Sequence, residues 1–124
     1  MSKIFMIIGC LGGALSVMIG AFGAHALKAT LEASHRIETF ETAVKYQFYH
    51  SIALVLLGLI MQNTVNQRFN IAGYLFIAGI LIFSGSLYIL CLTGIKWLGA
   101  ITPIGGLAMI AGWLLMAWIL YKSF

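Results

Sequence analysis

Four long stretches without a charged side chain dominate this sequence. Asp, Glu, Lys and Arg are missing from residues 4–27, 46–67, 69–95 and 97–121. A helix of about 20 apolar residues crosses the hydrocarbon core of a bilayer, at about 1.5 Å per residue. Backbone amides in lipid must be hydrogen-bonded within the protein, and the alternation of barrel strands is lacking, so helices are required. The sequence therefore predicts an all-α bundle of four transmembrane helices.

The four spans are expected to form a single integral membrane domain over residues 1–124. Their expected bounds are about 4–26, 43–62, 71–92 and 97–121. Between the first two spans, residues 31–45 carry apolar and charged side chains on different helical faces. This pattern predicts a short amphipathic helix at the membrane surface that runs on into the second span, with Ser34 as its N-cap. An even number of crossings places both termini on the same side of the membrane.

Basic side chains lie at the ends of the spans and not in one patch. The net charge is +4, and only 8% of the residues are charged, against about 25% in soluble domains. Lys and Arg at helix ends can extend to lipid headgroups, so we expect membrane lipids and not nucleic acid as partners. The basic residues are almost evenly divided between the two sides, which leaves the orientation open. We expect a multi-pass protein of the cell membrane, the inner membrane if the source is bacterial.

The first span ends in the triplet Ala24-His25-Ala26, which resembles a signal-peptide cleavage site. The apolar region from Ile4 to Ala24 is nearer to spanning length than to signal length, so we expect it to be retained.

Small residues follow one face of the first span at steps of four: Gly12, Ser16, Gly20 and Ala24. Such a row lets a neighbouring helix approach closely, which predicts a helix-packing face. The partner is either another helix of this chain or a second copy.

The second span is unusual because only the stretch that follows Ser51, up to Met61, is free of polar residues, and this stretch is too short to cross a bilayer. The helix must therefore include the polar turn that holds Lys45, Tyr46 and His50. Polar side chains at membrane depth usually face the bundle interior or a watery cavity.

Two motifs carry a family resemblance: "GAFGAHAL" at the end of the first span and "FETAVKYQFYHSIALVLLG" leading into the second. With four spans and this length, the whole chain resembles the small membrane proteins of domain-of-unknown-function family 423. That family has bacterial inner-membrane members and an animal transmembrane relative. Lys45, Tyr46 and His50 match its second motif. The resemblance implies a four-helix membrane protein and no assigned biochemical role.

The topology predicts that His25, Lys45, Tyr46 and His50 lie at similar depth where the first span ends and the second begins. One interpretation is structural, with His25 hydrogen-bonded to the second span. Another is a site for a small ligand, lipid or ion, in which Lys45 holds an anionic headgroup. Weaker alternatives are a b-type haem between His25 and His50, and a metal bound by these histidines and Cys91.

The sequence indicates no catalytic residues, because every acidic residue lies between Glu32 and Glu41 and the spans contain none of them. We therefore expect a non-enzyme without a cofactor or a metal ion. The leading hypothesis is an accessory, assembly or scaffold subunit that packs against other membrane proteins or copies of itself. The alternative is a protein that binds or transports a small ligand, lipid or ion through His25, Lys45, Tyr46 and His50.

Overall fold

A computed structural model describes residues 1–123, and this part of the chain contains helices and short turns but no strand. The helices are α1 (Ser2–Ala24), α2 (Lys28–Ala33), α3 (Ile37–Asn63), α4 (Arg68–Gly79), η1 (Ile80–Ser84), α5 (Gly85–Thr93) and α6 (Leu98–Ser123). The segment η1 is a π-helical section that joins α4 and α5 into one rod. Within residues 1–123, four rods are long and apolar enough to cross a membrane, which confirms the predicted fold class.

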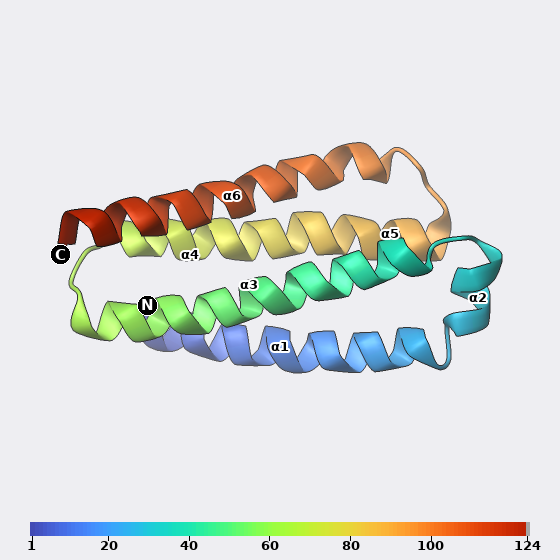
Figure 1. Cartoon of the computed structure of the whole chain (residues 1–124), viewed down its shortest axis with the longest axis horizontal. Helices are drawn as coiled ribbons and strands as arrows, with labels where there is room; N and C mark the ends of the chain where they lie inside the picture. Colours follow the sequence, from blue (N-terminus) through green and yellow to red (C-terminus); the bar gives the residue numbers. More distant parts are fainter. Residues whose placement is uncertain (124) are drawn as a thin grey trace.

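The rods lie side by side in the order α1, α3, α4–η1–α5 and α6 (Figure 1). The chain ends lie toward the same end of the bundle, which we call the terminal end (Figure 1). At the opposite end, α2 connects α1 to α3, and a short turn connects α5 to α6. The main apolar core lies between the rods and consists of Phe5, Ala53, Leu54, Leu57, Phe69, Ala72, Phe76, Met116 and Ile119.

The predicted amphipathic helix over residues 31–45 is wrong in its continuity, because the chain turns between α2 and α3. His35 has a φ of 57°, in the left-handed region that polar residues such as His enter at turns. The His35 N–H donates to the Glu32 carbonyl at 3.2 Å, and the Arg36 N–H donates to the Leu31 carbonyl at 2.9 Å. These two bonds form a Schellman motif, which ends α2.

Ser34 therefore closes α2, and its predicted role as an N-cap is wrong. Its hydroxyl donates to the Thr30 carbonyl at 3.0 Å. The next helix, α3, begins at Ile37, six residues before the expected second span, and runs on into that span as predicted. This earlier start determines how deep every later residue of α3 lies in the bundle.

The helices α1 and α3 pack closely because glycines of α1 lie against α3. A Cβ atom added to Gly9 would lie 2.6 Å from the Ser51 carbonyl oxygen and 2.7 Å from Cγ2 of Val55. A Cβ atom at Gly23 would overlap the ring of Phe40. Close approach of this kind is the usual way in which helices pack in lipid, where the hydrophobic effect does not drive them together.

The predicted small-residue row occupies this interface only in part. Gly12 faces the Ser51 hydroxyl, at 2.5 Å from an added Cβ, and Gly20 faces Val44 at 3.3 Å. Ser16 is buried, and its hydroxyl donates to the Gly13 carbonyl. Ala24 is exposed. The partner of the row is thus a helix of the same chain, α3.

Two glycines one turn apart on α1 provide a matched test of this packing. We expect Gly9→Ala to destabilise the protein by about 1–3 kcal/mol, because the new methyl group would overlap the backbone of α3. Gly13→Ala gains the same helix propensity, but its Cβ meets only Phe48 at 3.9 Å, so we expect no loss. Thermal unfolding in detergent gives the unfolding midpoint of each variant. Equal midpoints for Gly9→Ala and Gly13→Ala would contradict this packing.

Candidate functional site

His50 lies inside the bundle, and both of its ring nitrogens are hydrogen-bonded. Trp113 of α6 donates its indole N–H to Nε2 of His50 at 3.0 Å. Because Nε2 must accept this bond, Nδ1 carries the proton and donates it to the Tyr46 carbonyl at 2.8 Å. The His50 ring is 5% exposed and lies 5.7 Å from the Phe76 ring. His50 therefore links α3 to α6 as a neutral side chain, a structural role.

His25 is not part of this arrangement. It is exposed and follows the last residue of α1. Because α1 and α3 are antiparallel, with Gly23 opposite Phe40 and Gly12 opposite Ser51, His25 lies near the first turn of α3. His50 is therefore about 18 Å farther along the bundle at 1.5 Å per residue.

The early start of α3 explains why the expected cluster of His25, Lys45, Tyr46 and His50 does not form. His50 lies about 20 Å inside α3, counted from Ile37 at 1.5 Å per residue. The two histidines are too far apart to bind one haem iron, and the Nε2 lone pair of His50 already accepts from Trp113. Within residues 1–123, no three His, Cys, Asp or Glu side chains come together to hold a metal ion, and the proposed set with Cys91 is not assembled.

Tyr46 and Gln47 also contact neighbouring helices, Tyr46 from an exposed position and Gln47 from the interior of the bundle. The Tyr46 ring stacks on the Phe83 ring with 4.6 Å between the centroids. Gln47 donates from Nε2 to the Gly12 carbonyl at 3.0 Å and accepts at Oε1 from the Tyr88 hydroxyl at 2.6 Å. Gln47 thus ties α3 to both of its neighbours. This role was not predicted from the sequence, although a Gln in the middle of a spanning helix is a signal for it.

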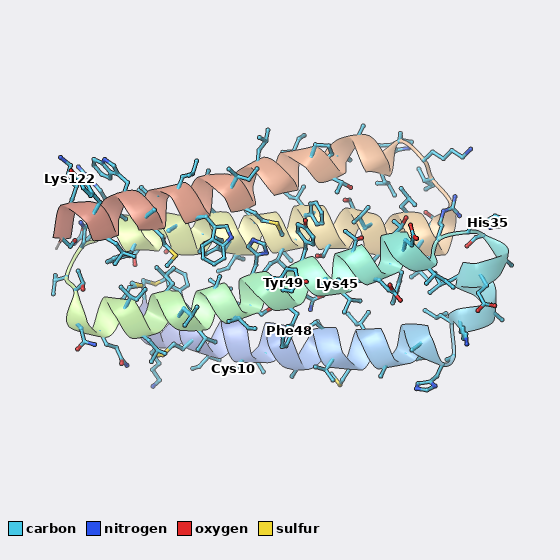
Figure 2. All side chains as sticks on the ribbon, in the orientation of Figure 1. Cys10, His35, Lys45, Phe48, Tyr49 and Lys122 are labelled. Atoms are coloured by element: carbon cyan, nitrogen blue, oxygen red, sulfur yellow. The ribbon has the colours of Figure 1, made fainter. Side chains whose placement is uncertain are left out.

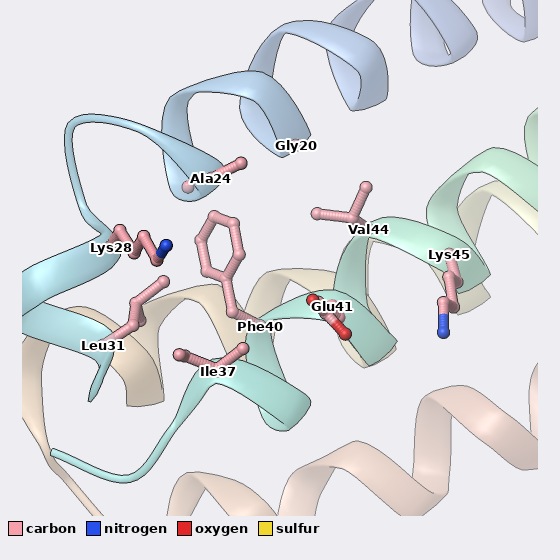
Figure 3. A pocket seen from close by; sticks show the side chains of 10 residues that line it. Gly20, Ala24, Lys28, Leu31, Ile37, Phe40, Glu41, Val44 and Lys45 are labelled. Atoms are coloured by element: carbon pink, nitrogen blue, oxygen red, sulfur yellow. The ribbon is translucent and has the colours of Figure 1, made fainter.

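Lys45 lies elsewhere, in a cleft bounded by the end of α1, by α2 and by the first turns of α3 (Figure 3). The volume of this cleft is about 330 Å³. We call it the cationic cleft, and its lining residues are Gly20, Gly23, Ala24, Lys28, Leu31, Ile37, Phe40, Glu41, Val44 and Lys45. Figure 3 shows Lys28 at one side of the Phe40 ring and Lys45 beyond Val44 at the other.

The cationic cleft combines an apolar floor with charged rims. Leu31 and Phe40 form the floor and are 3% and 5% exposed. The side chains of Lys28, Glu41 and Lys45 are exposed at the rims. Two ammonium groups and one carboxylate leave an excess of one positive charge. Such a cleft can hold the apolar part of an amphiphile on its floor and a negative headgroup between the lysines.

Both sequence motifs meet in the cationic cleft. The first motif contributes Gly20, Gly23 and Ala24, and the second contributes Phe40, Glu41, Val44 and Lys45. The glycines leave room for the large side chains of α3, because a Cβ at Gly23 would overlap Phe40. The motifs are thus close together, as the topology predicts, but around Lys28, Glu41 and Lys45 and not around the two histidines.

Four apolar rods with a hydrogen-bonded polar interior and short connections define a small multi-pass membrane protein. The chain belongs to the family described as "Protein of unknown function (DUF423)", which matches residues 19–106. This range contains both motifs and the whole cationic cleft. The family resemblance predicted from the two motifs is therefore confirmed.

The chain is similar over almost all of its length to membrane proteins of staphylococci. A UPF0382 membrane protein of Staphylococcus aureus (strain bovine RF122 / ET3-1) is 47% identical over 120 residues, 97% of this chain and 97% of that protein. A UPF0382 membrane protein of Staphylococcus haemolyticus (strain JCSC1435) is 50% identical over 114 residues, 92% of each chain. No solved structure matches the chain. These relatives confirm a multi-pass protein of the cell membrane.

The structural role of His50 gives a prediction with a matched control. We expect Trp113→Phe to lower the stability by about 1–3 kcal/mol, because it leaves the buried Nε2 of His50 without a donor. Trp97→Phe removes the same atoms just before α6, at an exposed position (64%), and leaves the His50 bond intact. The two variants are compared by thermal unfolding. Similar losses would show that the bond to His50 does not stabilise the fold.

Proposed function

We propose that this protein is a non-enzymatic lipid-binding protein of the cell membrane that holds an anionic amphiphile in the cationic cleft. The observation that carries the proposal is the placement of Lys28 and Lys45 at the two rims of an apolar cleft. Of the four residues expected to form a ligand site, Lys45 alone belongs to this cleft.

The depth of the cationic cleft supports a lipid as the occupant. The apolar helix α1 ends at Ala24, and Lys28 begins α2, so this region corresponds to the membrane surface. Lys45 lies about 12 Å inside α3 from Ile37, at 1.5 Å per residue. Its four methylene groups can follow the apolar wall while the ammonium group extends toward the headgroups. A lipid has the same order of polarity, with the charge at the surface and the acyl chain deeper.

The charges of the cleft support a ligand with a single negative charge, such as a phosphodiester. Glu41 offsets one of the two lysines, so a neutral occupant would leave one positive charge unbalanced. Each lysine near an anionic membrane contributes about 1 kcal/mol of attraction. The ligand class is therefore an anionic phospholipid or another amphiphile with one acidic headgroup.

This proposal predicts weaker lipid binding when both rim lysines are neutralised. The purified protein is mixed with phosphatidylglycerol in detergent, and the bound lipid is counted by native mass spectrometry. We expect Lys28→Gln/Lys45→Gln to weaken the binding of one lipid by about 30-fold, from about 1 kcal/mol for each lysine.

The control is Lys3→Gln/Lys96→Gln, which removes two exposed lysines outside the cleft and the same total charge. Equal weakening in the two double variants would mean that general charge, and not the cleft, attracts the lipid. Unchanged thermal midpoints ensure that both variants are folded.

A role as an accessory or scaffold subunit is a second proposal, and the exposure of α1 supports it. A shallow groove of about 320 Å³ runs along α1 and α3 at mid-membrane. Its α1 side is formed by small or exposed residues, which allow close approach of another helix: Gly9, Cys10, Gly13, Ala14 and Val17. A partner helix would lie in this groove.

A photo-crosslinker at Val17 tests the accessory role in intact membranes. We expect one discrete protein adduct from this position, because Val17 is 63% exposed and lines the groove. Leu107 on α6 is 66% exposed and lies outside the groove, so it serves as the control. Adducts with lipid alone at both positions would contradict a partner helix on α1.

A further inference from the structure

Two cationic side chains converge on one indole ring at the terminal end of the bundle. The guanidinium carbon of Arg68 lies 5.2 Å from the centroid of the Trp118 ring. The ammonium nitrogen of Lys122 lies 5.8 Å from the same centroid. The two charges are therefore separated by no more than about 11 Å, in contacts of cation–π length. Arg68 begins α4, whereas Trp118 and Lys122 lie one turn apart on α6.

The acidic side chains of the sequence are too distant to balance these two charges. The sequence contains three Asp and Glu residues, and all of them lie between Glu32 and Glu41. This region is at the end opposite to Lys122, as the positions of His35 and Lys122 in Figure 2 show. A cation–π contact at an exposed site is worth about 0.5–1 kcal/mol and does not neutralise charge. An external anion between Arg68 and Lys122 would reduce their mutual repulsion.

The surroundings of Arg68 and Lys122 point to the headgroup layer of the membrane. Trp118 is 45% exposed and Tyr121 is 78% exposed on the last turns of α6. Trp and Tyr are enriched at this level of a bilayer, where the phosphate groups of lipids lie. The planar guanidinium group can bind two phosphate oxygens, and a lysine can approach a third as a point charge.

We propose that Arg68, Trp118 and Lys122 form a second anion site, which binds the phosphate group of an anionic phospholipid at the terminal end. The headgroup phosphate lies between the two cations, and the indole ring contacts the glycerol and the first acyl carbons. This site is separate from the cationic cleft, because the two lie at opposite ends of the bundle and belong to opposite leaflets. It does not depend on the function proposed for that cleft.

The test compares Arg68→Gln/Lys122→Gln with the wild-type protein, each reconstituted in vesicles of phosphatidylcholine with phosphatidylglycerol. After mild extraction, native mass spectrometry measures the phosphatidylglycerol molecules that stay bound. We expect the double variant to lose one of these phosphatidylglycerol molecules. Its affinity for this lipid should fall by about 30-fold, because two positive charges are neutralised. Arg68→Lys keeps the charge without the planar fork, so we expect an intermediate loss.

Lys3→Gln/Lys96→Gln is the matched control, because it removes the same charge at residues outside both sites. It should retain as many bound lipids as the wild-type protein, whereas Arg68→Gln/Lys122→Gln combined with Lys28→Gln/Lys45→Gln should lose two. Equal retention in the wild-type protein and in Arg68→Gln/Lys122→Gln, with both folded by thermal unfolding, would overturn the second site. Displacement of the lipid by millimolar inorganic phosphate would overturn the lipid assignment and identify a site for free phosphate.

Discussion

The close contact between α1 and α3 determines most of the remaining structure. At Gly9 and Gly23 the two helices are near enough that a single methyl group would overlap the partner helix. This contact sets the antiparallel register in which the end of α1 meets Phe40. The register in turn places Lys28 beside the first turns of α3 and creates the cationic cleft. A shift along α1 by one turn, about 5.4 Å, would separate the two motifs.

The interior hydrogen bonds complement the glycine contacts. Association of helices in lipid depends on packing and on polar contacts between helices. Gln47 ties α3 to α1 and α5, and His50 ties α3 to α6. The Ser84 hydroxyl adds a bond of 2.6 Å to the Ala43 carbonyl. These interior polar groups are hydrogen-bonded to one another. A ligand is therefore bound more easily by the charged side chains at the two ends of the bundle.

The distribution of charges along the sequence was sufficient to predict the four helices, and two motifs were sufficient to predict the family. The predicted cluster around His25 and His50 does not form, and the local cause is the turn at His35. A left-handed residue that is not glycine gives little sequence signal, so the turn that separates α2 from α3 was not predicted. The partner of His50, Trp113, lies in another helix, and pairs so far apart in sequence cannot be inferred from spacing. The same applies to Arg68 and Trp118.

An experimental structure in phosphatidylglycerol nanodiscs shows directly whether a lipid occupies the cationic cleft. We expect density for an acyl chain along Phe40 and Val44, with the headgroup phosphate between the ammonium groups of Lys28 and Lys45. A cleft closed by its own side chains, with both lysines directed away from it and no lipid density, would contradict lipid binding in the cationic cleft.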